Sequence, residues 1–218
     1  AMGKRDWVGL PIYTMRKFFH NEILVGANTG IEKPSDLKGK RVGVPEYQQT
    51  AAIWTRGVLQ HEFGVHPSDR QWWMERNPDK SHGASTGFAA PQGVSVTPVP
   101  LDSNLGEMLL TGRIDAIVHY IAHGNLVDRS RVDLFNHPGA RTLFPDREAE
   151  SARYYKKTGI FPINHCMVIK RSVYERNPWI ALNLYSGFLA AMDQVRKDSL
   201  AWMAPYYEMG LVDREVRN

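Results

Sequence analysis

The chain has 218 residues, and its 27 Lys and Arg against 23 Asp and Glu give a formal net charge of +4. Apolar residues make up 43% and charged residues 23%, which excludes a disordered chain, a coiled coil and a collagen-like repeat. No stretch approaches the roughly 20 apolar residues that cross a bilayer, so we expect no membrane insertion. The single cysteine, Cys166, excludes an internal disulfide framework and a multi-cysteine zinc site.

The basic residues are spread along the chain and form no long run. Proteins that bind nucleic acid concentrate such charge on one stripe, so we expect no nucleic-acid partner. A mild positive balance favours a small anionic ligand instead. Residues 1–6 carry positive charge without the apolar core of a secretory signal behind them, so the expected location is cytoplasmic.

The first elements follow from short apolar runs and helical spacing. Residues 21–27 (NEILVGA) form an apolar run closed by turn residues, which predicts a strand. Residues 34–40 predict a helical turn and a loop, and residues 41–44 (RVGV) predict a buried strand. From Thr50 the apolar residues recur at helical spacing until Gly64, which is typical of a helix C-cap.

The same alternation continues through the middle of the chain. Further strands are predicted at residues 71–74, 94–99 and 114–118. Residues 77–92 are rich in Gly, Ser, Pro and Asn and predict a loop or hairpin. Residues 102–104 (DSN) offer N-caps for a short helix that ends at Gly112. Strands alternating with helices indicate an α/β fold with a mostly parallel sheet.

The last third of the chain is less regular. Between Tyr120 and Gly159 we find no periodic pattern. Residues 166–169 predict a strand, and Pro178 precedes the first turn of a long helix. A separate last helix is predicted to end near Gly210.

Four segments, residues 36–48, 109–116, 154–165 and 173–179, together carry a family resemblance. Residues 36–48 (DLKGKRVGVPEYQ) and 109–116 (LLTGRIDA) resemble type 2 periplasmic-binding-protein domains, which include the solute receptors of nitrate, sulfonate and taurine transporters. Residues 45–65 and 154–165 (YYKKTGIFPINH) resemble the more specific 4,5-dihydroxyphthalate decarboxylase family, and this resemblance covers most of residues 8–210. It implies the binding-protein fold in a cytoplasmic enzyme.

The resemblance also implies a division into two lobes joined by two crossing strands. Residues 1–27 are then the end of lobe one and the first crossing strand, and residues 28–125 are lobe two. Residues 126–165 are the connection and the second crossing strand, and residues 166–218 are the C-terminal helical part of lobe one. Relatives have a longer segment before the first crossing strand, so the N-terminal part of lobe one is expected to be absent.

A candidate ligand loop lies between a predicted strand and a predicted helix start. It contains Tyr47, Gln48 and Thr50. Ligands of open α/β sheets bind outside the carboxyl ends of strands, and the free N–H groups of a helix start favour an anion. Thr50 adds a hydroxyl as the N-cap, and Tyr47 adds an aromatic face. The alternative interpretation is an ordinary turn with a cap.

Three further residues are candidates for carboxylate binding and proton transfer. Arg16 suits bidentate recognition of a carboxylate, although a basic loop facing water is the alternative. His20 and His165 carry imidazoles that exchange protons near neutral pH. His165 lies at the expected second crossing strand and would look into the cleft between the lobes. The alternative for His165 is a buried structural histidine.

These residues and the resemblance give one preferred hypothesis, a decarboxylase of a hydroxylated aromatic dicarboxylate such as 4,5-dihydroxyphthalate. The substrate, a small aromatic carboxylate, is held in a cleft between the lobes that closes by hinge motion. Arg16 and the helix start at Thr50 hold the retained carboxylate. His165 or His20 protonates the ring, and Glu46 orients a ring hydroxyl. A homo-oligomer is a further candidate state.

The alternative function is a non-catalytic solute-binding protein in the periplasm. It would feed an aromatic acid or sulfonate to an ABC transporter and would use the same cleft without a proton donor. A third candidate, a thiamine-precursor synthase of the same broad fold, lacks its expected cysteine-rich motif here.

A metal site is a separate alternative. Asp115, His119 and His123 are spaced by four, which places them on one face of a helix or strand. A carboxylate and two imidazoles are suitable ligands for a divalent metal. The favoured interpretation is that Asp115 caps or orients the backbone after Gly112 and that the two histidines are a loop residue and a surface residue. We therefore expect no cofactor, with a divalent metal as the alternative.

Overall fold

The computed structural model describes residues 6–77, 79–81, 87–121 and 127–210. The chain forms two compact units, and each is described by itself. Unit 1 comprises residues 1–15 and 165–218, and unit 2 comprises residues 16–164. These boundaries differ from the expected lobes, because residues 16–27 and the described residues of 126–164 pack within unit 2.

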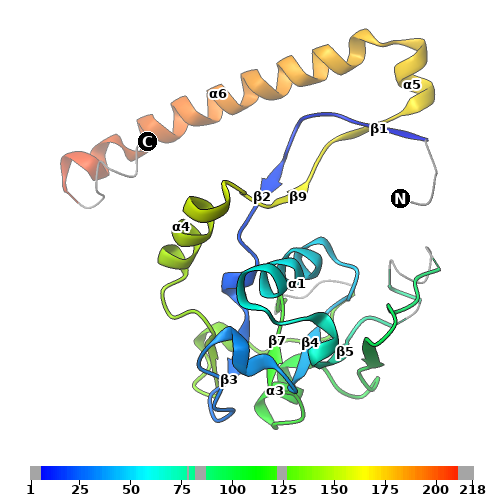
Figure 1. The fold of residues 1–218 in the computed structure, drawn as a ribbon. Helices are drawn as coiled ribbons and strands as arrows, with labels where there is room; N and C mark the ends of the chain where they lie inside the picture. Colours follow the sequence, from blue (N-terminus) through cyan, green and yellow to red (C-terminus); the bar gives the residue numbers. More distant parts are fainter. Residues whose placement is uncertain (1–5, 78, 82–86, 122–126, 211–218) are drawn as a thin grey trace. The chain divides into compact units, whose positions relative to one another are not determined.

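Unit 2 is built on one six-stranded sheet with the strand order β6-β5-β4-β7-β3-β8, of which Figure 1 labels β3, β4, β5 and β7. The strands are β3 Leu24–Gly26, β4 Arg41–Val44, β5 Gln71–Met74, β6 Ser95–Pro98, β7 Ala116–Ile117 and β8 Ala140–Thr142. β4 is parallel to β5 and β7, and β5 is parallel to β6. β3 runs antiparallel to β7 and β8. The expected α/β class with a mostly parallel sheet is confirmed.

Helices of unit 2 follow from local caps as well as from apolar spacing. The α-helices are α1 Thr50–Phe63, α3 Leu105–Leu110 and α4 Arg147–Thr158. The short 3-10 helices are η1 His20–Glu22, η2 Pro34–Leu37, η3 Pro67–Asp69 and η4 Leu134–Asn136. α1 ends at Gly64, whose φ of 63° is the left-handed conformation that a glycine C-cap supplies.

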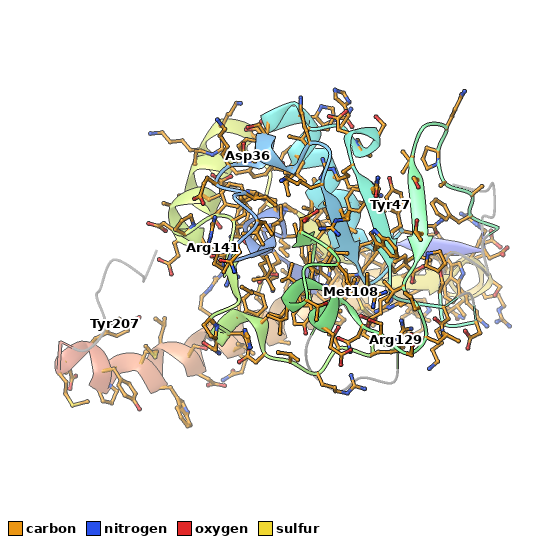
Figure 2. The ribbon with its side chains drawn as sticks, turned by 90° about the horizontal axis from the view of Figure 1, so that it is seen from below. Asp36, Tyr47, Met108, Arg129, Arg141 and Tyr207 are labelled. Atoms are coloured by element: carbon orange, nitrogen blue, oxygen red, sulfur yellow. The ribbon has the colours of Figure 1, made fainter. Side chains whose placement is uncertain are left out.

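The sheet of unit 2 packs between two apolar clusters. Ile23 and Val25 belong to one cluster, with Trp72 as its largest side chain. Leu24 belongs to the other, together with Met108 of α3 (labelled in Figure 2). Successive side chains of a strand point to opposite faces, so the continuous apolar run before Gly26 reflects burial on both faces of the sheet.

The expectation of a crossing strand over residues 21–27 is therefore corrected. The first part of this segment forms η1, and only Leu24–Gly26 is a strand. β3 lies inside the sheet of unit 2, between β7 and β8, and all of its residues are buried. The chain passes from one unit to the other within β2 (Met15–Arg16) and within β9 (Ile163–His165).

Unit 1 combines one strand pair with a long helix. β1 (Trp7–Gly9) pairs antiparallel with β10 (Val168–Lys170), and α5 (Arg171–Arg176) follows. α6 (Trp179–Glu208) is one continuous helix, where the sequence predicted two, because no proline interrupts it before Pro205. None of its residues is buried. Within the described residues, no helix combines the length and the apolar character that crossing a membrane requires.

Candidate functional site

Polar side chains gather beyond one end of the strands of unit 2. Glu46, Arg76 and His119 each lie two residues after the end of a strand, namely β4, β5 and β7. These strands are mutually parallel neighbours, so the three residues lie at the same edge of the sheet. β3 runs the other way, which brings Glu22, two residues before it, to that edge. We call Glu22, Glu46, Arg76, His119 and Asp128 together the carboxyl edge. Open α/β sheets bind ligands at this end of their strands.

Arg76 is the centre of a buried ion network at this edge. Its Nε and Nη2 donate to Asp128 Oδ1 and Oδ2 over 2.8 and 3.0 Å, and its Nη1 donates to Glu46 Oε2 over 3.3 Å. Ser81 Oγ donates to Glu46 Oε1 over 2.6 Å. The hydrogen bonds to Asp128 raise the pKa of Arg76, with burial acting in the opposite direction. Two carboxylates therefore face one guanidinium, and the position of Glu46 is fixed.

His119 combines three unusual features. Its φ of 58° is the one positive value at a residue other than glycine in the described parts of the chain, a conformation that costs about 1–3 kcal/mol. Its Nδ1 is buried without a hydrogen-bond partner, and its ring meets Phe19 edge-on at 5.7 Å. Burial lowers the pKa of His119, although the charge of Glu22 acts to raise it. Strain and a desolvated imidazole at a ligand-binding edge point to a functional residue.

His20 has a different set of partners. Its ring is 1% exposed, and its Nε2 lies 2.9 Å from Glu150 Oε1 on α4. Glu150 also accepts two hydrogen bonds from Arg153, over 2.7 and 2.8 Å. Burial lowers the pKa of His20, and the hydrogen bond with Glu150 opposes this shift without cancelling it. The structure thus places His20 against α4 through Glu150 and Tyr154, whose ring centroid is 5.1 Å away.

Neighbouring residues at the predicted ligand loop, Glu46 and Tyr47, contact different partners in the structure. Glu46 contacts Arg76 and Ser81, whereas the ring of Tyr47 packs on the far side of the loop against Trp72, 5.3 Å away, and under the guanidinium of Arg56, 3.7 Å away. Figure 2 labels Tyr47 in the sheet region of unit 2. Tyr47 and Gln48 line a cavity of about 400 Å³ that does not include Glu46.

Thr50 requires a correction. The N-cap of α1 is Gln49, whose φ of −58° and ψ of 137° are non-helical, and Thr50 is the first helical residue. Thr50 is exposed, and no side chain caps the helix start. The helix begins one residue earlier than the sequence suggested because its first intrahelical hydrogen bond, from Ile53 N, ends on Gln49 O.

The two remaining candidates lie in different units. Arg16 belongs to unit 2, is exposed, and places its guanidinium 5.2 Å from the ring centroid of Phe161. His165 is the last residue of β9, is exposed and belongs to unit 1. The other predicted site residues all belong to unit 2.

Asp115 binds both the backbone and the side chain of Arg41. It accepts hydrogen bonds from the backbone N and Nε of Arg41 over 2.8 and 3.0 Å, and from Nη2 over 2.7 Å. Burial acts to raise the pKa of Asp115, but the hydrogen bonds from Arg41 outweigh it and lower this pKa. His123 lies outside the described residues. Across the described ranges, no group of three His, Cys, Asp or Glu residues is arranged to hold a metal ion.

Sequence reasoning missed Arg76 and Asp128. A signal for Arg76 existed, because it follows the predicted strand 71–74 as Glu46 follows the strand 41–44. Neighbouring Glu75 is also buried, and its Oε2 accepts hydrogen bonds from Leu105 N over 2.7 Å and from Ser130 Oγ over 3.0 Å. Asp128 lies 52 residues from Arg76 in an irregular segment, where no local pattern marks it.

The chain is similar to two curated proteins named 4,5-dihydroxyphthalate decarboxylase. The protein from Comamonas testosteroni is 34% identical over 188 residues, which is 86% of this chain and 55% of that protein. The protein from Pseudomonas putida is 30% identical over 156 residues, which is 72% of this chain and 58% of that protein. The relationship predicted from the motifs is confirmed, and the chain spans about half the length of the curated relatives it matches.

Two other comparisons complete this result. No protein-family model matches the chain. Among solved structures, the periplasmic aliphatic sulphonate binding protein SsuA from Escherichia coli is similar at a TM-score of 0.48 and 16% identity, over 93% of this chain and 55% of that one.

Proposed function

We propose that this chain, a relative of the 4,5-dihydroxyphthalate decarboxylases, acts as a carboxy-lyase on a hydroxylated aromatic dicarboxylate such as 4,5-dihydroxyphthalate. The observation that carries the proposal is the 34% identity over 188 residues to a protein of that name. A small aromatic carboxylate as the ligand and a cytoplasmic location belong to the same proposal. The carboxyl edge of unit 2 is the proposed place of the chemistry.

The reaction needs a proton acceptor beside a ring hydroxyl. When the hydroxyl para to the leaving carboxylate loses its proton, the electron pair moves into the ring and the carbon that bears the carboxylate takes up a proton. The carbon–carbon bond then breaks, carbon dioxide leaves, and the electron pair restores the aromatic ring. The hydroxyl finally regains its proton. One proton is consumed and one carbon dioxide is released in each turnover.

We assign the proton acceptor to His119 rather than to His20. A lowered pKa keeps the imidazole of His119 neutral near pH 7, as a base requires, and its buried Nδ1 has no hydrogen-bond partner. His20 shares both features, but its Nε2 is held by Glu150, which is itself paired with Arg153. That His165 donates the proton to the ring stays a prediction from the sequence.

Charge at the carboxyl edge supports binding of the hydroxyl and the retained carboxylate. Glu46 is held by Arg76 and Ser81, so its carboxylate accepts a hydrogen bond from a ring hydroxyl without moving. The start of α1 has no side-chain cap, which leaves its N–H groups and the positive end of its dipole for a carboxylate. Arg16 remains the proposed guanidinium partner of that carboxylate.

The test is release of carbon dioxide from 4,5-dihydroxyphthalate by the protein and by two histidine variants. His119→Gln removes the proposed base, and we expect a loss of about 10²–10⁴-fold in kcat. His61→Gln changes an exposed histidine of α1 and should leave kcat unchanged. Saturable binding of 4,5-dihydroxyphthalate without release of carbon dioxide would replace the enzyme by a solute-binding protein.

A further inference from the structure

Arg56 of α1 lines a cavity that lies apart from the carboxyl edge. The cavity of about 400 Å³ is walled by Tyr47, Ile53, Phe88 and Val94, and Arg56 is its charged member. We call this cavity the Arg56 pocket. Its volume falls within the usual range of small-molecule sites, about 300–1,000 Å³. Its walls are mainly apolar and aromatic, and Phe88 stacks on Tyr47 with ring centroids 5.8 Å apart.

Arg56 is fixed in place without being neutralised. Its guanidinium lies 3.7 Å from the ring centroid of Tyr47, and its Nη1 donates to the backbone oxygen of Tyr47. Its three partners, the rings of Tyr47 and Trp72 and the carbonyl of Tyr47, carry no formal charge. Burial lowers the pKa of Arg56, and among the described residues no carboxylate acts to raise this pKa. The guanidinium of Arg56 therefore lies in the cavity wall, and no carboxylate of the described residues pairs with it.

Arg70 is a second guanidinium near the Arg56 pocket, because both arginines lie over the ring of Trp72. It is 4% exposed, its guanidinium carbon is 5.1 Å from the ring of Trp72, and its Nη2 donates to Val65 O over 3.0 Å. Its Nε and Nη1 are buried without a partner. Burial lowers the pKa of Arg70 to about 10, and the charge of Arg56 contributes to this shift. Two guanidinium groups thus share one region, and a buried unpaired charge is costly.

The nearest opposing charge, Asp69, is already engaged. Its Oδ2 accepts the backbone N–H of His66 over 2.8 Å as part of the η3 turn. Asp69 acts on Arg70 through space only, since no salt bridge joins the two side chains. An anion in the Arg56 pocket would pair with Arg56 and offset the charge of Arg70.

We propose that the Arg56 pocket binds a small organic acid, with the carboxylate on the Arg56 guanidinium and an apolar or aromatic body against Ile53, Phe88 and Val94. The apolar walls favour an organic acid over inorganic phosphate, because only the former removes those walls from water. The residues of the carboxyl edge do not line this pocket. It is therefore a second acid-binding site, and it stands independently of the proposed decarboxylase function.

Binding of benzoate, followed by NMR and titration calorimetry, tests this proposal. The indole N–H of Trp72 donates to Pro67 O over 2.9 Å, and Pro67 lines the pocket, so the Trp72 indole resonance should shift on saturation. Arg56→Gln should weaken benzoate binding about 10–100-fold, the loss of a charged hydrogen bond. Arg56→Lys keeps the charge and should recover part of that loss. The matched control, Arg113→Gln, removes an exposed arginine of unit 2 and should change the affinity less than twofold.

Three results would overturn the proposal. They are equal benzoate affinity in the protein and in Arg56→Gln, an unmoved Trp72 indole resonance at saturation, and inorganic phosphate binding as tightly as benzoate. Circular dichroism of each variant confirms that it is folded. His119→Gln separates the two sites, because it should lower decarboxylation about 10²–10⁴-fold while the affinity of benzoate for the Arg56 pocket, followed at the Trp72 indole resonance, stays unchanged.

Discussion

His20 Nε2 lies 2.9 Å from Glu150 Oε1, with both side chains buried between η1 and α4. Arg153 donates to both oxygens of the same carboxylate. This pair joins the segment before β3 to a helix about 130 residues later in the chain. This contact holds η1 against α4 within unit 2, and the predicted role of His20 as a proton donor stays a prediction.

The buried histidines predict how the stability of the protein depends on pH. Burial lowers the pKa of His20 and of His119 in the folded state, below the value of about 6.5 in the unfolded chain. At a pH between the folded-state and the unfolded-state pKa of these histidines, the unfolded chain binds more protons than the folded protein. The free energy of unfolding therefore falls as the pH falls below about 6.5. Urea unfolding at a series of pH values measures this slope.

The histidine variants give this experiment its control. His20→Gln should flatten the decline below pH 6.5, whereas His61→Gln, at an exposed position of α1, should leave it unchanged. If both variants kept the slope of the unmodified protein, the titration of His20 would have no part in acid destabilisation.

The Arg76 network predicts a large loss of stability. Arg76→Met leaves Glu46 and Asp128 buried without their guanidinium partner, and breaking such a buried pair costs about 3–5 kcal/mol. Urea unfolding at pH 7 measures the difference. Arg113→Met removes an exposed arginine from the same unit and should cost less than about 0.5 kcal/mol. Similar losses in the two variants would contradict a structural role for the Arg76 network.

Two glycines form a matched pair for the packing of unit 2. A Cβ on Gly43 would lie 2.6 Å from Leu105 Cδ2 and 2.8 Å from Ile114 Cδ1, both in fully buried side chains. Gly43→Ala should therefore lower the free energy of unfolding by about 1–3 kcal/mol. Gly57, inside α1, has open space around the same position, so Gly57→Ala should raise it by about 0.5–1 kcal/mol. Thermal unfolding of both variants decides the signs.

The sequence predicted the elements whose burial and caps are local. The strand 41–44 and the strand 71–74 have the predicted bounds in the structure, because Pro45 stops the first and charged residues flank the two tryptophans of the second. α1 likewise ends at Gly64 as predicted. α4 was missed because only Glu150 and Tyr154 are buried along its length, which leaves no apolar periodicity to detect.

The candidate site was only partly predictable for the same physical reason. Glu46 follows an apolar strand directly, so a rule about strand ends finds it. Glu46 is paired with Arg76, Arg76 with Asp128, and His20 with Glu150. These contacts join residues 30, 52 and 130 positions apart in the chain. No local pattern encodes such pairs. The strained backbone of His119 is visible only in the folded chain.

His119 also predicts the pH dependence of the reaction. Because its pKa is lowered by burial, the imidazole is neutral above about pH 6.5 and gains a proton as the pH falls below that value. We expect kcat for decarboxylation to fall on the acid side and to stay level between pH 7 and 8. The acid limb should disappear from the residual activity of His119→Gln and persist in His61→Gln.

The most direct measurement uses 4,5-dihydroxyphthalate labelled with ¹³C in its carboxylates and follows binding and labelled carbon dioxide in the same sample. Our account predicts one labelled carbon dioxide per molecule of substrate consumed, with release about 10²–10⁴-fold slower in His119→Gln while the substrate still binds. Release at the same rate by the protein and by His119→Gln, or binding with no release by the protein, would contradict it.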